Sequence, residues 1–175
     1  ESSRHDPINW ASFERGNAVA ALIVNTDTEH VMLIQQFRAP VAAAEGPNHR
    51  LVETVAGMIR QNEEVVQSLR REIEEETGYQ LRFDGDTGLL KDSQYICQFY
   101  PSPGGSSESI YLYYVEVNSE TPKAPGGGLP EDGEMIEPVH IPLKEFFAAI
   151  DRGAFKDPKI IIAGQWLQKR WKNLK

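Results

Sequence analysis

The sequence predicts an α/β protein in which a mixed β-sheet lies between helices. Three observations predict this class: strand-like runs come first, a segment with a helical apolar period follows, and further strands and helices occupy the rest of the chain. This order favours a sandwich over a sheet wound from repeated strand–helix–strand units. With 40% hydrophobic and 25% charged residues, the 175-residue chain has ordinary globular composition, and we expect residues 1–175 to form a single domain.

The first part of the chain reads as strands. Three runs rich in apolar residues are expected to be strands: 17–24, 31–37 and 51–56. Residues 25–28 (NTDT) predict a hairpin turn between the first two. Residues 39–50 mix Pro, Gly and small side chains, so we expect a surface loop there.

A helix is predicted next, because the apolar period changes from two residues to between three and four. Asn62 is the expected N-cap, with acidic residues in the first turn, and Thr77-Gly78 is the expected end, since glycine tolerates the left-handed cap conformation. The apolar stripe consists of Val65, Val66, Leu69 and Ile73. We expect the acidic side chains of this helix to lie on the opposite side.

The second half predicts further strands and two helices. The expected strands are 94–99, 109–117 and 135–141. Residues 118–133 hold too many Pro and Gly for regular structure and read as a loop. A helix opened by Pro142 is expected to stop at Gly153, and the last helix is expected over 158–174.

The helix ends on an unusual run of acid, LRREIEEETGY at 69–79. A helix C-terminus already carries partial negative charge, so each Glu there costs about 0.3–1 kcal/mol. Something positive must offset this. Glu72, Glu75 and Glu76 are three and four residues apart, share a face, and offer the oxygen ligands that Mg²⁺ prefers. A solvated acidic helix face is the simpler alternative.

Overall charge limits the partners. The chain has 18 basic and 26 acidic residues, a net charge of −8, and no basic stripe, so we expect no nucleic-acid partner, and a polyanion would need a metal to bind. No apolar run is long enough to cross a bilayer and no signal-peptide pattern opens the chain, so we expect no membrane partner. The single Cys97 fits a reducing compartment, and we expect a cytoplasmic location.

The acidic run belongs to a longer pattern over 57–79. Its fixed positions, in order, are Gly57, Glu63, Arg71, Glu72, Ile73, Glu75, Glu76, Gly78 and an apolar position held by Tyr79. This spacing resembles the Nudix box at every fixed position, with Tyr79 where an aliphatic residue is more usual. The resemblance implies a Nudix-type α/β/α sandwich and an enzyme that hydrolyses a nucleoside diphosphate joined to another group.

The resemblance also implies a metal site. Glu72, Glu75, Glu76 and the backbone carbonyl of Ala56 would hold divalent cations, Mg²⁺ or Mn²⁺. Such cations neutralise the charge that builds on a diphosphate in the transition state. Glu63 and Arg71 would brace the loop and the helix, and Gly57 would let the chain turn tightly.

Three segments outside the box resemble the ADP-ribose and nucleotide-sugar pyrophosphatase branch of the family. They are LIQQFRAPV, YPSPGGSSE and GGGLPEDGEMIEPVHIPL. The resemblance implies that Arg38 contacts the diphosphate or the terminal sugar and that Glu108 helps to bind substrate. It also implies an acidic residue that reaches the site from the late loop: Glu134 as a further metal ligand, and Glu131 or Asp132 as the base, with Glu75 next. A surface salt bridge for Arg38, and loop solvation for Glu108 and Glu134, are the alternatives.

The substrate stays open between two groups that share one diphosphate. Residues 82–90 separate the box from Pro101 and Pro103 more widely than in typical ADP-ribose hydrolases, and an inserted hairpin would explain this. The glycine-rich segment APGGGLPEDGEMIE favours nucleotide sugars such as UDP-glucose or GDP-mannose. The products would be a nucleoside monophosphate and a sugar phosphate. The alternatives are a pyrophosphatase for another nucleotide such as a dNTP, and a non-catalytic nucleotide-sugar sensor. By resemblance we also expect a homodimer, with residues 1–16 as a possible dimer contact.

Overall fold

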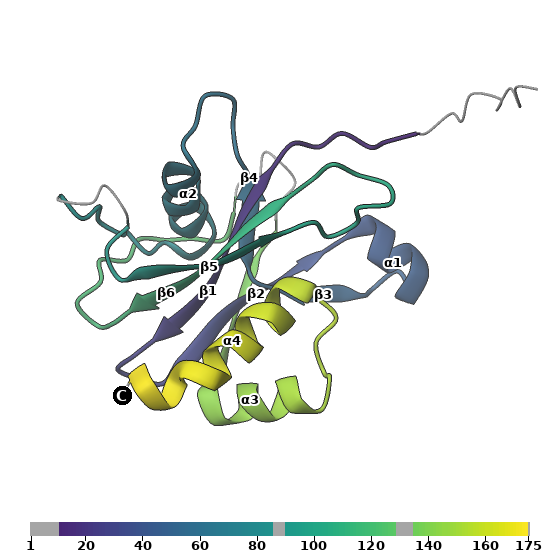
Figure 1. Ribbon diagram of the computed structural model, residues 1–175. Helices are drawn as coiled ribbons and strands as arrows, with labels where there is room; N and C mark the ends of the chain where they lie inside the picture. Colours follow the sequence, from purple (N-terminus) through teal and green to yellow (C-terminus); the bar gives the residue numbers. More distant parts are fainter. Residues whose placement is uncertain (1–10, 86–89, 129–134, 175) are drawn as a thin grey trace, which may run out of the picture.

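The computed structural model describes residues 11–85, 90–128 and 135–174, and shows one mixed sheet with helices on both faces (Figure 1). The strands are β1 Ala18–Asn25, β2 His30–Phe37, β3 Arg50–Glu53, β4 Val55–Met58, β5 Ser93–Phe99, β6 Ile110–Val117 and β7 Glu137–Pro142. The helices are α1 Ala39–Glu45, α2 Val65–Thr77, α3 Leu143–Asp151 and α4 Pro158–Leu174. The predicted α/β sandwich is confirmed.

Strand β1 lies at the centre of the sheet. It pairs in parallel with β6 from Ala18 to Asn25, and antiparallel with β2 and β4, so the sheet is mixed. The edge of β1 away from β6 is shared, because residues 18–21 pair with β4 and residues 23–25 pair with β2. The sheet order is β3-β2-β1-β6-β5, with β7 beside β2.

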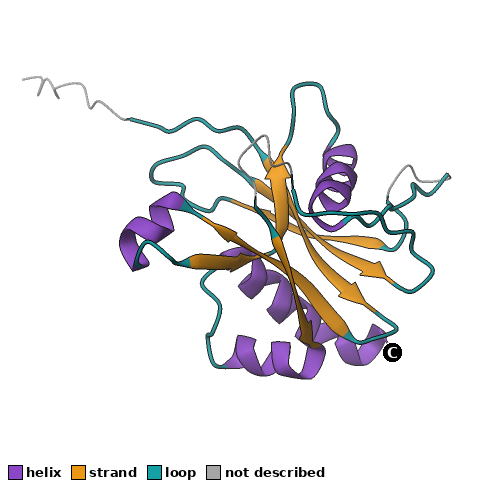
Figure 2. Ribbon diagram, turned by 180° about the vertical axis from the view of Figure 1, so that it is seen from behind, coloured by secondary structure: helices purple, strands orange, loops and turns teal. Residues whose placement is uncertain are grey.

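Two apolar layers cover the two faces of this sheet. Side chains alternate along β1, so Ala18, Ala20, Leu22 and Val24 face one layer and Val19, Ala21 and Ile23 face the other. Helix α2 supplies Leu69 and Ile73 to the second layer. Helices α3 and α4 cover the first layer, as the view from behind shows (Figure 2). The box helix therefore has one face of the sheet largely to itself.

The predicted loop at 39–50 is partly wrong, because residues 39–45 form α1. Three consecutive alanines favour a helix, Pro40 lies in its first turn where a missing N–H costs nothing, and Gly46 ends it with φ 117°. The signal for a helix was present but short, and Pro and Gly at its two ends made it look like a loop.

The predicted strand at 51–56 is in fact two strands that meet at Thr54. Residue Glu53 pairs with Ile34 of β2, whereas Val55 pairs with Ala21 of β1. The chain thus changes partner at Thr54, because β1 and β2 diverge there. This crossing brings the start of the box to the middle of the sheet.

The start of α2 also differs from the prediction, whereas its end is confirmed. Asn62 has φ 62° and lies in a turn, and the N-cap is Glu64, so no acidic residue occupies the first helical turn. At the other end Gly78 adopts the left-handed conformation, with φ 79°, and donates its N–H to the Glu74 carbonyl at 2.9 Å.

Other boundaries agree to within two residues. Asn25 accepts hydrogen bonds from the N–H groups of Asp27 and Thr28 at 3.1 and 3.0 Å, which confirms the hairpin turn. Strand β7 begins two residues later than expected. Helix α4 spans the predicted residues and buries Ile160 fully.

Asp157 ties α4 to the crossing at Thr54. One oxygen of its buried carboxylate accepts the N–H of Thr54 at 3.1 Å, and the other accepts the N–H of Lys159 at 3.0 Å, as an N-cap does. The Lys159 ammonium also lies 3.0 Å from that oxygen. Asp157 therefore accepts the Thr54 N–H at the point where the chain changes its strand partner from β2 to β1.

We predict that Asp157→Ala lowers the free energy of unfolding by about 1–3 kcal/mol, since it removes a cap and leaves a buried donor unsatisfied. Urea denaturation measures this. Asp151→Ala at the exposed end of α3 is the control and should change the value by less than about 0.5 kcal/mol. Equal effects of the two substitutions would contradict the role given to Asp157.

Candidate active site

The box residues meet where β4 runs beside α2. Gly57 of β4 faces Glu72 so closely that a Cβ on Gly57 would overlap the Glu72 carboxylate. This close approach is what requires glycine at the first box position. Glu72 is only 8% exposed, with its charge held against the strand.

One turn later, Glu76 also lies on β4. Its carboxylate accepts the N–H of Ala56 at 3.3 Å, and the residue is 3% exposed. The expectation that the acidic side chains point away from the buried side is therefore wrong for Glu72 and Glu76. Because β4 carries only Ala56 and Gly57 at this point, there is room for carboxylates between the strand and the helix.

Arg71 forms ion pairs with three glutamates of the box. Its Nε and Nη2 donate to the two oxygens of Glu63 at 2.8 and 2.9 Å, and its Nη1 lies 2.5 Å from Glu72 and 3.1 Å from Glu75. Nη2 also donates to the Met58 carbonyl at 3.0 Å. One guanidinium thus joins the loop before α2, the helix and the end of β4, which is the bracing that the box predicted.

These contacts change the acidity of both partners. Hydrogen bonds from Arg71 lower the pKa of Glu63 to about 2, with help from the Arg60 N–H at 3.0 Å. The same bond to Glu63 raises the pKa of Arg71 above its ordinary value. Both groups are therefore charged throughout the neutral range.

The donors at this junction suit a hard cation. Carboxylates of Glu72, Glu75 and Glu76 come from one helix, and Ala56, whose carbonyl is the fourth expected ligand, lies in the neighbouring strand; oxygen is the ligand that Mg²⁺ and Mn²⁺ prefer. Within residues 11–85, 90–128 and 135–174, however, no three acidic, His or Cys side chains already converge on one point. Arg71 Nη1 bridges Glu72 and Glu75, the Ala56 N–H donates to Glu76, and Arg60 Nη2 lies 3.4 Å from Glu75. The residues fit a divalent cation, with the countercharge supplied by arginine.

Arg38 and Glu108, the expected substrate-binding residues, form ion pairs with residues outside the box. Arg38 Nε donates to Glu53 at 2.7 Å, so it does form the ion pair that was the alternative prediction, but with a carboxylate that is 6% exposed. The other Glu53 oxygen lies 3.5 Å from the Lys159 ammonium. Glu108 lies 3.7 Å from Arg15 Nη1. Glu131, Asp132 and Glu134 fall outside the described residues.

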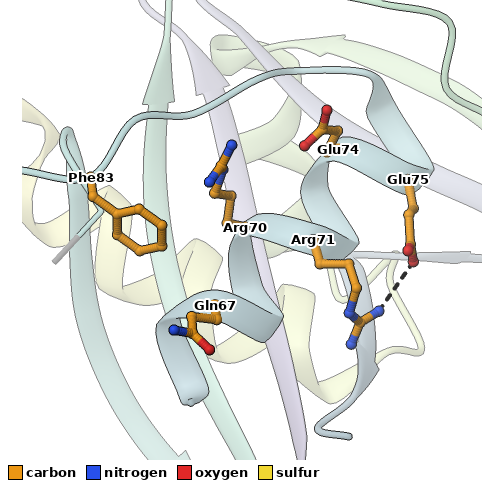
Figure 3. Close-up of a pocket in the computed structure, with 6 residues that line it drawn as sticks. All are labelled: Gln67, Arg70, Arg71, Glu74, Glu75 and Phe83. Atoms are coloured by element: carbon orange, nitrogen blue, oxygen red, sulfur yellow. Dashed lines mark hydrogen bonds and ion pairs between the residues drawn. The ribbon is translucent and has the colours of Figure 1, made fainter. Parts of the chain in front are cut away.

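A hollow of about 610 Å³ adjoins the box on the outer face of α2 (Figure 3). Arg70 extends from the helix toward Phe83, and its guanidinium carbon lies 5.4 Å from the centre of that ring. Arg71 and Glu75, joined by their ion pair, line the opposite side. The hollow has the volume of a small-molecule site, and its wall includes two fixed positions of the box, Arg71 and Glu75.

Sequence reasoning missed several residues that shape the site. Glu53 was read only as part of a strand, although a lone carboxylate in an apolar run is itself a signal. Asp157 followed by Pro158 is the pattern of an N-cap with proline at the first helical position, and it could have been found. The close approach of Gly126 to Thr77 and Gly78 could not have been found, because glycine-rich segments read only as loops.

The fold and the box together define a class of protein. A family model described as the NUDIX domain matches residues 14–163. The chain belongs to the Nudix family and is a Nudix hydrolase, which confirms the resemblance and the expected enzyme class.

Individual relatives share one name. A GDP-mannose pyrophosphatase of Yersinia enterocolitica is 35% identical to this chain over 156 residues, which cover 89% of this chain and 75% of the relative. One of Cronobacter sakazakii is 32% identical over 158 residues, covering 90% and 76%. One of an Enterobacter strain is 33% identical over 156 residues, covering 89% and 75%.

Among the residues that the structure describes, no helix combines the length and the apolar character needed to cross a bilayer.

We predict that the Glu63–Arg71 pair makes stability depend on pH. Because the folded pKa of Glu63 is about 2 against an ordinary 4.5, its contribution is complete above about pH 4.5 and is lost as the pH falls toward 2. Unfolding free energies measured from pH 6 down to about pH 2 should therefore fall less steeply for Glu63→Gln than for the wild type. Glu120→Gln, an exposed site outside the network, should keep the wild-type slope. Parallel curves for wild type and Glu63→Gln would show that the pair is not formed.

Proposed function

We propose that this protein hydrolyses the diphosphate of a nucleoside-diphosphate sugar or of ADP-ribose, releasing a nucleoside monophosphate and a sugar phosphate. The observation that carries the proposal is the similarity to GDP-mannose pyrophosphatases over about nine-tenths of the chain, the box included. Among the candidates, GDP-mannose is therefore the first to test, in line with the glycine-rich segment at 124–134.

The proposed metal ligands are Glu72, Glu75 and Glu76 with the Ala56 carbonyl, and Mg²⁺ or Mn²⁺ is the proposed cation. A divalent cation there would offset the charge that develops on the diphosphate during hydrolysis. This chain's own contribution is to hold the ligands: Gly57 makes room for Glu72, and Ala56 fixes Glu76. Arg71 keeps Glu75 close by through its ion pair at 3.1 Å.

Arg38 and Glu108 are the proposed substrate-binding residues. About two-fifths of the Arg38 side chain is exposed, so its guanidinium can take a phosphate while Glu53 holds Nε. Glu108 follows the Ser-Pro-Gly-Gly loop, where its N–H donates to Ser106 Oγ at 3.1 Å. Both assignments rest on the resemblance of their flanking segments.

The acids of the late loop complete the proposal. Glu134 is proposed as a further metal ligand, and Glu131 or Asp132 as the general base, with Glu75 as the next candidate. These roles come from the sequence, since an acidic group just before β7 would be aimed by a rigid strand.

A homodimer and a cytoplasmic location are also proposed. The Phe13 N–H donates to the Gly105 carbonyl at 2.8 Å, while the Phe13 side chain is 68% exposed. An apolar side chain is therefore available for a subunit contact. The location rests on the single free Cys97.

A substrate panel tests the function. With Mg²⁺, the protein is expected to cleave GDP-mannose, UDP-glucose or ADP-ribose in preference to dNTPs, as product analysis by chromatography would show. Glu76→Gln keeps the shape and the acceptor for the Ala56 N–H but loses one charge, and kcat should fall at least about a hundredfold. Circular dichroism should show the same fold for both proteins.

Three outcomes would count against the proposal. Cleavage of dNTPs alone would replace the substrate class. Tight binding of a nucleotide sugar without turnover would favour a sensor, although a sensor has no need of three intact carboxylates. Full activity of Glu76→Gln would remove the metal-site assignment.

The late-loop acids call for a separate comparison of Glu131→Gln, Asp132→Asn and Glu134→Gln. The base is expected to lose kcat with little change in KM, whereas a metal ligand should also raise the Mg²⁺ concentration needed for half-maximal rate. Steady-state kinetics at several Mg²⁺ concentrations separates the two. If all three variants keep full activity, the base lies within the box, and Glu75 is tested next.

A further inference from the structure

A short segment, 124–128 (APGGG), lies against the C-terminal turn of α2. The N–H groups of Gly127 and Gly128 donate to the carbonyls of Glu76 and Glu75 at 2.9 and 3.1 Å. On the other side of the cap, the Ala124 N–H donates to the Gly78 carbonyl at 2.8 Å. The segment therefore binds the backbone of two of the three glutamates whose side chains are proposed to hold the cation.

These bonds fall where the helix is least stable. The last carbonyls of a helix have no donor within the helix and carry its partial negative charge, and here acidic side chains add to it. Two backbone N–H groups pointing at the Glu75 and Glu76 carbonyls supply the positive ends of dipoles at that point. They offset part of the repulsion through the backbone of the helix, without contact to the carboxylates themselves.

The contact works only because two glycines face each other. A Cβ on Gly126 would lie 2.5 Å from the Thr77 carbonyl carbon, 2.6 Å from the Gly78 nitrogen and 2.8 Å from the Glu76 oxygen. A Cβ on Gly78 would overlap the Ala124 oxygen. Gly126 has no positive φ, so backbone conformation does not demand glycine there; the close approach to α2 does.

The residues just before the segment extend the attachment beyond the box. Tyr79 forms an antiparallel bridge with Lys123, and the Lys123 ammonium lies 4.6 Å from the centre of the Tyr79 ring. The Gln80 N–H donates to the Pro122 carbonyl at 2.8 Å. Tyrosine at the last box position is thus matched by a cation from this part of the chain.

We propose that Gly126 is a positioning residue for the metal site. By letting segment 124–128 bind the last turn of α2, it fixes the backbone from which Glu75 and Glu76 project. The inference rests on the proposed function, because it concerns the same carboxylates. It assigns to Gly126 a role distinct from that of the acids further along the late loop.

The test compares Gly126→Ala with Gly85→Ala, a control position where an added Cβ would meet no atom within 4 Å and where φ is not positive. Mn²⁺ affinity is measured by calorimetry without substrate. Gly126→Ala should weaken it roughly tenfold, the scale seen when the support of a metal ligand is lost, and Gly85→Ala should leave it unchanged. Amide exchange of Gly127 and Gly128 should speed up in Gly126→Ala alone.

The outcomes separate the two proposals. If the wild type binds no Mn²⁺, the metal site fails and the inference fails with it. If the wild type binds Mn²⁺ and Gly126→Ala binds it equally well, only the inference is overturned. Should Gly126→Ala not fold, Lys123→Met loosens the same attachment without a steric overlap. It should weaken Mn²⁺ binding about two- to fivefold, the value of one cation–π contact, and unchanged affinity would again overturn the inference.

Discussion

The charge on Arg71 is the constraint on which the rest of the site depends. Glutamates three and four residues apart on one helix repel each other, and two of them are buried against a strand. A single guanidinium, placed between Glu63, Glu72 and Glu75 and anchored on the Met58 carbonyl, keeps this arrangement together. Lysine would not replace it, because only the planar fork of arginine can serve several carboxylates at fixed angles.

The position of that arginine follows from how the sheet is built. Strand β1 divides one edge between two partners, so the chain must cross from β2 to β1 at Thr54 and then continue as β4 beside α2. At this crossing the Thr54 N–H donates to Asp157, which lies in the helical layer on the other face of the sheet and also caps α4. The two helical layers are thus joined at the strand that leads into the box, so the sheet beneath the box is held from its other face.

What the sequence revealed and what it did not divide along physical lines. Spacing located the box, and helical periodicity located α2 and α4, because both are local properties of the chain. The split of 51–56 at Thr54 depends on which distant strand each half meets, so no local pattern contains it. The burial of Glu72 and Glu76 was missed for the same reason, since the room for them comes from Ala56 and Gly57 on β4. Residues 124–128 are mostly Pro and Gly and read as a loop, because their close approach to Gly78 is a contact between segments far apart in the sequence.

The parallel pairing of β1 with β6 has a consequence for how the molecule forms. Ala18 pairs with Ile110, and the whole Nudix box lies between these two residues in the sequence. Pairing of β1 with β6 therefore closes a very long loop, and we expect it to form late in folding. During synthesis β1, β2 and α2 leave the ribosome before β6 exists, and the run AVAALIV then has one edge without its permanent neighbour. Such an edge is open to pairing with other chains. The chain is therefore most open to misassembly, and to binding by chaperones, in the interval before the central strand β1 pairs with β6.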